Sequence, residues 1–156
     1  NNCVFQGYSN KGHDGFLGNS VIGEWCNLGA DTNSSNLKNN YSNIRVWSYS
    51  AEGTIDTNLQ FHGLIMGDHS KCGINTMFNT GTIVGVGANL FGGNFLPKFI
   101  PSFSWGGSEI TETYQFDKAM SVASVVMERR NLTLTDADKN ILSQVFTDSK
   151  KYRSWE

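Results

Sequence analysis

Apolar residues recur at every sixth position over much of this chain. From Met66 to Phe95 the sequence divides without a gap into five hexads, and each hexad begins with an apolar residue: Met66, Cys72, Phe78, Val84 and Leu90. The fifth position of these hexads is small or polar: Ser70, Thr76, Thr82, Ala88 and Asn94. The same frame covers residues 16–33, where the hexads begin at Phe16, Ile22 and Leu28. A period of six fits neither an amphipathic helix, near 3.6, nor a simple strand, near 2.

This period predicts an all-β fold with one short strand and one corner in each hexad. The apolar residue points into a narrow prism, and the small fifth residue also points inward, where little volume remains. Glycine at the second position of three hexads (67, 73 and 85) relieves the backbone at the turn. Three hexads make one triangular coil, and the coils stack through parallel ladders. The predicted architecture is a parallel β-helix, a single-stranded coil wound into a right prism.

The six-residue spacing is interrupted between Asn33 and His62 and is lost after Leu90. Residues 44–49 and 55–61 alternate like strands, with Ala51-Glu52-Gly53 between them, which predicts a projecting hairpin or long loop inserted at residues 34–63. Inserted loops of solenoids often carry the binding surface. The aromatic residues of 91–107 are expected to cap the open end of the prism: Phe91, Phe95, Phe99, Phe103 and Trp105.

Two helices should follow as a C-terminal extension over residues 108–156, outside the coil of residues 1–107. The first is expected over 116–130, with Phe116, Ala119, Met120, Ala123 and Met127 on one face. Thr135 should N-cap the second, with Asp136 and Asp138 in its first turn. Its expected apolar stripe is Ile141, Leu142, Val145 and Phe146.

Composition narrows the choice of partners. The chain has 156 residues, 17 glycines, 38% hydrophobic and only 17% charged residues, which suits one domain with many tight corners. A net charge of −2 offers no broad basic field for nucleic acid, and no apolar run is long enough to cross a membrane. Three cysteines without a C-x-x-C pair favour reduced thiols and a cytoplasmic location.

The segment from Lys11 to Asn39 carries a family resemblance. It contains Lys11-Gly12-His13-Asp14-Gly15-Phe16-Leu17-Gly18-Asn19, then Ile22-Gly23, Leu28-Gly29-Ala30-Asp31-Thr32, and Asn36-Leu37-Lys38-Asn39. This resembles the acetyltransferase half of the bifunctional N-acetylglucosamine-1-phosphate uridyltransferase family, whose order is His, an aromatic three residues on, Leu-Gly-Asp, Gly-Ala-Gly-Thr and Asn-Tyr-Asp-Gly. The resemblance is close over residues 11–36 and generic over the later hexads. It implies the left-handed form of the β-helix, which the repeat itself does not determine.

The resemblance also implies roles for particular residues. His13 matches the general base that deprotonates a sugar amine, and an imidazole titrates in the right range for this task. Asn36 matches a substrate-holding Asn. Leu37-Lys38-Asn39 replaces Tyr-Asp-Gly, and Lys38 lies near the place of the family's lysine, so the sugar-phosphate side of the site differs. The alternative interpretation is that His13 is a polar residue at a corner of the coil and has no catalytic role.

The spacing of the coil adds further candidates for the same site. His13 and Asp31 are eighteen residues apart, one full turn of three hexads, so we expect them to superpose on adjacent coils and to share a groove with Asn19 and Asn36. Together with Lys38, which only the resemblance supplies, Asn19, Asp31 and Asn36 are the candidate substrate-binding residues. The resemblance also implies an acetyl-CoA co-substrate in a groove along the coil, which Gly85, Gly87 and Ala88 would suit, and these residues suit the narrow prism equally well.

The expected function is acetyl transfer from acetyl-CoA to an amino-sugar phosphate, with the resemblance implying a homotrimer and a separate N-terminal nucleotidyltransferase domain in the full protein. No Gly-rich phosphate loop followed by a helix occurs, so nucleotidyl transfer is not expected of this segment. No metal is expected, because His13, His62 and His69 do not have the spacing of a three-histidine zinc site. The alternative is a non-catalytic trimerisation or regulatory module for the missing domain.

Overall fold

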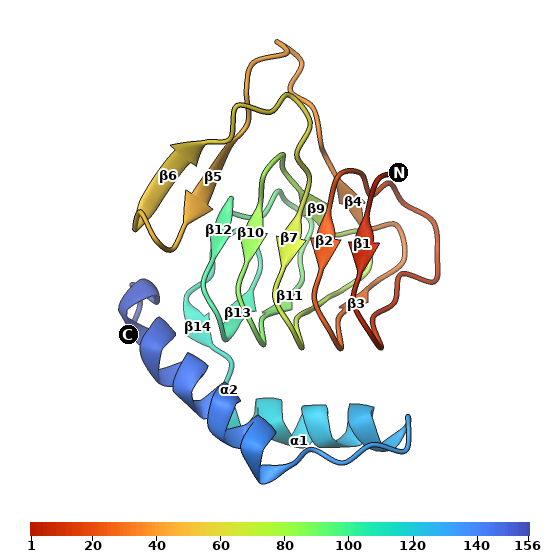
Figure 1. The fold of residues 1–156 in the computed structure, drawn as a ribbon, viewed down its shortest axis with the longest axis vertical. Coiled ribbons are helices and arrows are strands. Elements are labelled where there is room, and N and C mark those ends of the chain that lie inside the picture. Colours follow the sequence, from red (N-terminus) through yellow and green to blue (C-terminus); the bar gives the residue numbers. More distant parts are fainter.

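A computed structural model describes all 156 residues as a parallel β-helix with a projecting hairpin and two C-terminal helices (Figure 1). The first face of the prism is a five-stranded parallel sheet in the order β1-β2-β7-β10-β12. Its strands are β1 (Val4–Phe5), β2 (Val21–Ile22), β7 (Ile65–Met66), β10 (Ile83–Val84) and β12 (Phe99–Ile100). Each strand has two residues, one pointing into the prism and one pointing out, as a hexad repeat requires.

Two further faces close the triangle. The second face contains β3 (Asn27–Leu28), β8 (Lys71–Cys72), β11 (Asn89–Leu90) and β13 (Ser104–Gly106), with β14 (Glu112–Thr113) added antiparallel at its edge. The third face pairs β4 (Asn33–Ser34) with β9 (Met77–Phe78), and Phe95 extends it through a bridge to Met77. The predicted parallel β-helix is confirmed, and its coils are consistent with the left-handed form that the resemblance implies.

The prism interior explains the sequence pattern. The first residues of the hexads from Met66 onward are all buried, as are Ile22 and Leu28. The small fifth residues are mostly buried too, and their hydroxyls bond to corner carbonyls: Ser70 Oγ donates to Gly85 O at 2.7 Å and Thr76 Oγ1 to Gly73 O at 2.8 Å. A buried hydroxyl is tolerated when it has such a partner, which accounts for polar residues at this position.

The first coil departs from the expected frame. Asn10 pairs with Asn27, 17 residues later, whereas Ser70 and Ala88 of the middle coils are 18 apart and Val86 and Ser102 are 16 apart. Because the first coil is one residue short, Leu17 is the buried residue and Phe16 is 45% exposed. Placing Phe16 inside the prism from its hexad position was therefore wrong.

The insertion leaves from the corner between the third and first faces. Its central part is the antiparallel hairpin of β5 (Arg45–Ser48) and β6 (Gly53–Asp56). After the insertion the chain returns in register, with Val21 of β2 paired to Ile65 of β7. At the other end, β12 and β13 add another turn to the coil where the frame of the sequence is lost, with Ile100 and Phe103 buried and Phe91 and Phe95 exposed.

The helices pack against the corner between the first and second faces. They are α1 (Phe116–Glu128) and α2 (Asp136–Asp148), followed by the 3-10 turn η1 (Ser149–Tyr152). Thr135 N-caps α2, as its sequence predicts, and the structure adds a reciprocal bond from Asp138 that completes a capping box. Ala123 and Met127 of α1 pack against Trp25 and Leu142, whereas Ile141, expected in the apolar stripe, is 64% exposed. Neither helix has the length and hydropathy of a membrane-crossing segment.

Candidate functional site

His13 lies in the corner between the second and third faces, on the first coil. Its side chain is exposed and makes no hydrogen bond, whereas Lys11 Nζ donates to the backbone carbonyls of His13 at 3.0 Å and Asp14 at 2.7 Å. The lysine therefore fixes the backbone of this corner and leaves the imidazole free to meet a ligand.

Asp31 occupies the same corner on the next coil, but it does not superpose on His13. The N–H of Asp31 donates to the carbonyl of Asp14 at 2.9 Å, so Asp14 is the residue directly beside it. The cause is the 17-residue spacing between the first two coils. His13 and Asp31 share a corner and are displaced from each other by one residue.

Asn19 and Asn36 lie together at the next corner, where the third face meets the first. Asn36 Nδ2 donates to Asn19 Oδ1 at 2.8 Å, and both side chains are half-buried. The whole third face separates this pair from His13 and Asp31, so the structure does not bring the four residues into one groove. Lys38 lies in the insertion, where its Nζ donates to the carbonyl of Asn43 at 2.7 Å.

The three residues expected to meet an acyl-CoA lie at the corner between the first and second faces, and only one of them reaches an open cavity. Ala88 points into the prism and is 1% exposed. Gly87, with φ of +66°, is covered by the ring of Phe103, which would stand 3.0 Å from an added Cβ. Gly85 lines an open cavity between the first face, the hairpin and the C-terminal segment.

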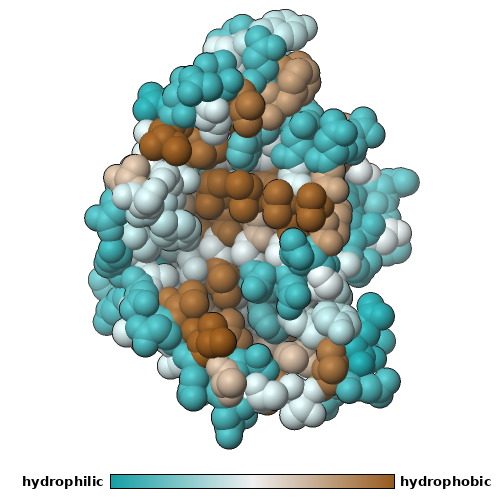
Figure 2. All heavy atoms as spheres, viewed as in Figure 1, coloured by the Kyte–Doolittle hydropathy of each residue, from teal (hydrophilic) through white to brown (hydrophobic).

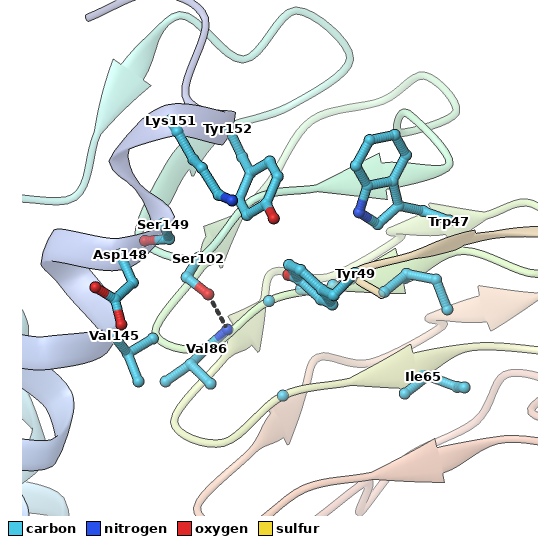
Figure 3. Close-up of a pocket in the computed structure, with 14 residues that line it drawn as sticks. Trp47, Tyr49, Ile65, Val86, Ser102, Val145, Asp148, Ser149, Lys151 and Tyr152 are labelled. Atoms are coloured by element: carbon cyan, nitrogen blue, oxygen red, sulfur yellow. Dashed lines mark hydrogen bonds between the residues drawn. The ribbon is translucent and has the colours of Figure 1, made fainter. Parts of the chain in front are cut away.

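That cavity has a volume of about 910 Å³ and is formed by three parts of the chain (Figure 3). Ile65, Ile83 and the backbone of Gly85 form its floor on the first face. Trp47 and Tyr49 of the hairpin and Val145 and Tyr152 of the C-terminal segment form its walls. The lining is mainly apolar, and the size lies in the range of small-molecule sites.

Charged and aromatic contacts join the hairpin to the C-terminal segment at this cavity. Lys151 Nζ is ion-paired with Glu52, and the Tyr152 hydroxyl donates to the same carboxylate at 3.2 Å. Hydrogen bonds from Lys151 and Tyr152, with the lysine charge, hold the pKa of the Glu52 carboxyl below its ordinary value. Burial raises the pKa of the Tyr49 hydroxyl, so it remains a neutral donor at the cavity wall.

The sequence pattern did not reveal this cavity. Its walls come from residues 47–49 and 145–152, which are about a hundred positions apart, and no periodicity relates them. The only signal was the pair Trp47 and Tyr49, two large aromatic side chains spaced for one face of a strand inside an insertion. That signal indicates a packing surface without saying what packs on it.

No protein-family model matches the chain. It is 33% identical over 102 residues to a bifunctional protein GlmU of Methanococcus aeolicus, a match that covers 63% of this chain and 24% of the relative. A crystal structure of a hexapeptide-repeat acetyltransferase from Vibrio cholerae, complexed with acetyl coenzyme A, aligns with a TM-score of 0.42 at 18% identity, over 62% of this chain and 50% of that one.

The repeat and the coil together define a hexapeptide-repeat β-helix domain. Within that class the chain is similar in sequence to part of a bifunctional protein GlmU, and it spans about a quarter of the length of that relative.

Proposed function

We propose that this domain transfers an acetyl group from acetyl-CoA to the amine of an amino-sugar phosphate. The observation that carries the proposal is the 33% identity over 102 residues to part of a bifunctional GlmU. The amine would attack the thioester carbonyl, the C–S bond would break, and the leaving thiolate of coenzyme A would take up a proton. A nucleotidyltransferase domain preceding this segment in the full protein belongs to the same proposal.

His13 is the proposed general base. Its imidazole is exposed and free of hydrogen bonds, so it can accept the proton that the attacking amine releases. Asn36 and Asn19, already paired with each other, are the proposed ligands of the sugar, and Lys38 of the adjoining insertion would add its charge. Asp31 shares the corner of His13, so it would reach the sugar together with His13. General-base catalysis of this kind typically contributes about 10² to 10⁴ in rate.

The cavity above Gly85 is the proposed place of the acyl donor. Its apolar floor and aromatic walls suit the uncharged arm that carries a thioester, and its volume of about 910 Å³ is sufficient for such an arm. This cavity lies over the first face, while His13 lies at the opposite corner of the first coil. A productive site therefore requires His13 from a second copy of the chain, in keeping with the expected homotrimer.

The exposed first face supports such an assembly. An apolar band runs across this face (Figure 2), and its exposed members include Val4, Val21 and Ile65. These are the outward residues of successive strands, so they form a continuous row. Exposed rows of this kind are often contact surfaces between proteins.

The experiment is a calorimetric titration with acetyl-CoA together with an acetyl-transfer assay on glucosamine-1-phosphate. Tyr49→Ala, which opens the cavity wall, should weaken acetyl-CoA binding about tenfold, the effect expected for a large aromatic contact. Phe61→Ala removes an exposed aromatic side chain of the same insertion outside the cavity and should leave binding unchanged. Absence of acetyl-CoA binding and of transfer in the wild type would overturn the proposal.

A non-catalytic trimerisation or regulatory module is the second candidate. It is favoured by the separation of His13 and Asp31 from Asn19 and Asn36, and by the apolar band on the first face. It predicts a stable trimer in light scattering with neither acetyl-CoA binding nor transfer. A monomer at micromolar concentration would contradict this alternative, and it would equally remove the shared site described above.

A further inference from the structure

A second cavity, of about 470 Å³, lies on the other side of the helical pair, between α1 and the first three coils. It shares no lining residue with the cavity above Gly85. Lys71, Arg129 and Arg130 contribute three positive charges to its wall, and no carboxylate lines it.

None of these three cations has an acidic partner. The salt bridges of the molecule involve Lys139, Lys151 and Arg153 only. Lys71 Nζ donates to the carbonyl of His69 at 3.0 Å, and the guanidinium groups of Arg129 and Arg130 make no hydrogen bond within the chain. The C-terminal end of α1 stabilises positive charge nearby, which can explain Arg129 and Arg130. This effect does not explain Lys71, because that half-buried lysine lies on the coil and faces the same groove.

An aromatic stack forms another wall. The rings of Tyr8 and Trp25 lie 4.1 Å apart with an interplanar angle of 8°, and Trp25 is buried while Tyr8 is 50% exposed. Beside them, Asn10 Nδ2 donates to Asn27 Oδ1 at 2.7 Å, which leaves the amide nitrogen of Asn27 free to donate. The groove thus combines unpaired cations, an aromatic ring and a free amide.

We propose that this groove binds a phosphate-bearing ligand that also carries a planar ring, as a nucleotide does, independently of the acyl donor. Arg129 and Arg130 would hold the phosphates through charge-assisted hydrogen bonds, and Lys71 would add its charge from the coil side. The ring would lie against Tyr8, and the free amide of Asn27 would bond to the edge of the ring. This inference does not rest on acetyl transfer, because its residues are absent from that site.

The test uses ATP as the probe, in calorimetry at low salt, with adenosine and inorganic triphosphate as its separated halves. ATP should bind more tightly than either half. The double variant Arg129→Gln/Arg130→Gln should weaken ATP binding at least tenfold, since the charge-assisted hydrogen bonds to the phosphates are lost. Tyr8→Asn keeps a residue that tolerates the left-handed backbone of φ 62° and should also weaken ATP binding, while Tyr8→Phe retains it.

Lys118→Gln is the matched control, because it removes one exposed positive charge from the same helix outside the groove. It should leave ATP affinity unchanged, and all variants should keep the melting temperature of the wild type. No ATP binding, or an equal loss in Lys118→Gln, would overturn the proposal. Triphosphate binding as tight as ATP binding would overturn the role of the ring.

A further titration separates this groove from the proposed acyl-donor site. ATP should bind with the same affinity when acetyl-CoA is present at saturation. Competition between the two would overturn the independence of the groove, because it would assign these residues to the nucleotide end of coenzyme A. The protein could bind ATP through Arg129 and Arg130 and yet show no acetyl transfer. That result would support this inference and would contradict only the proposed function.

Discussion

Glu52 at the turn of the β5–β6 hairpin is ion-paired with Lys151, 99 residues later in the C-terminal 3-10 turn. The contact joins the two segments that form the walls of the 910 Å³ cavity. Both side chains are more than half exposed, so the pair contributes little to global stability. Its effect is expected in the local motion of the hairpin.

Glu52→Gln should therefore increase amide exchange in the β5–β6 hairpin while leaving the melting temperature nearly unchanged. The wild type should show the same loss of protection at low pH, relative to the exchange rate of an unstructured chain at that pH, since the pKa of Glu52 is depressed in the folded protein. The stabilising contact is present above the ordinary value of 4.5 and is lost as the pH falls through the lower folded pKa. Hydrogen exchange measured against pH checks this, with Asp56→Asn, at the other end of the hairpin, as the control.

We expect His69 to give the free energy of unfolding a second pH dependence. Burial, followed by the charge of Lys71, lowers the pKa of its imidazole from 6.5 to about 4, against the opposite effects of Asp68 and Asp138. The unfolded chain then binds more protons than the folded chain between these values, so the free energy of unfolding should fall as the pH drops from about 6.5 to 4. His69→Asn, which suits the backbone φ of 59°, should reduce this slope in chemical denaturation. An unchanged slope would show that other groups produce it.

Arg153 should be important for docking the C-terminal segment. Its guanidinium is buried and donates to the carbonyls of Ser102 at 3.3 Å and Phe146 at 3.1 Å. Arg153→Met would leave these carbonyls without their donor and should lower the free energy of unfolding by about 3 kcal/mol. Lys150→Met, at an exposed neighbouring position, should change it by less than about 0.5 kcal/mol.

Gly63 is expected to be intolerant of any side chain. A Cβ there would collide with the carbonyl oxygen of Gly18 and the hydroxyl of Ser20, at the corner where the insertion rejoins the coil. Gly63→Ala should therefore cost about 2 kcal/mol in denaturation experiments. Gly93→Ala is the control, because no heavy atom outside its chain neighbours lies within 4 Å of the added methyl group. Equal stability of the two variants would contradict the close approach of the two backbones at Gly63.

His13→Ala should lower acetyl-transfer turnover by about 10² or more if the histidine is the general base. The melting temperature should be nearly unchanged, because the imidazole is exposed and makes no hydrogen bond within the chain. Lys11→Ala is a useful comparison, since it removes the hydrogen bonds to the backbone of this corner and leaves the imidazole in place. Loss of activity in Lys11→Ala alone would assign His13 no chemical role.

The fold could be predicted from the sequence because the spacing within each hexad determines which residue points into the prism. Ile22, Met66 and Val84 were recognisable as interior residues from spacing alone, and all three are buried on successive strands of one face. The N-cap at Thr135 was equally local. Such features depend on a few neighbouring residues, so a short stretch of sequence is enough to identify them.

The candidate site was harder to predict because it depends on the length of each turn. The expected stacking of His13 on Asp31 assumed 18 residues in every turn, and the first turn has 17. Because the first turn is one residue shorter than expected, Asp14 lies beside Asp31 at the place where His13 was predicted. The two cavities were inaccessible for a related reason, since their walls come from the docking of the hairpin and helices, which no periodicity encodes.

The pairing of Val21 with Ile65 spans 44 residues, whereas the next turn of the coil uses 18, yet the ladder continues without a change of register. A corner can therefore gain or lose sequence freely, while a single residue added within a face would reverse the inward and outward sides of that strand. The sequence of the coil and the sequence of the segment inserted at its corner can consequently change at different rates during evolution. A descendant of this chain could exchange the whole hairpin, and with it the ligand held above the first face, while the coil beneath kept every hydrogen bond.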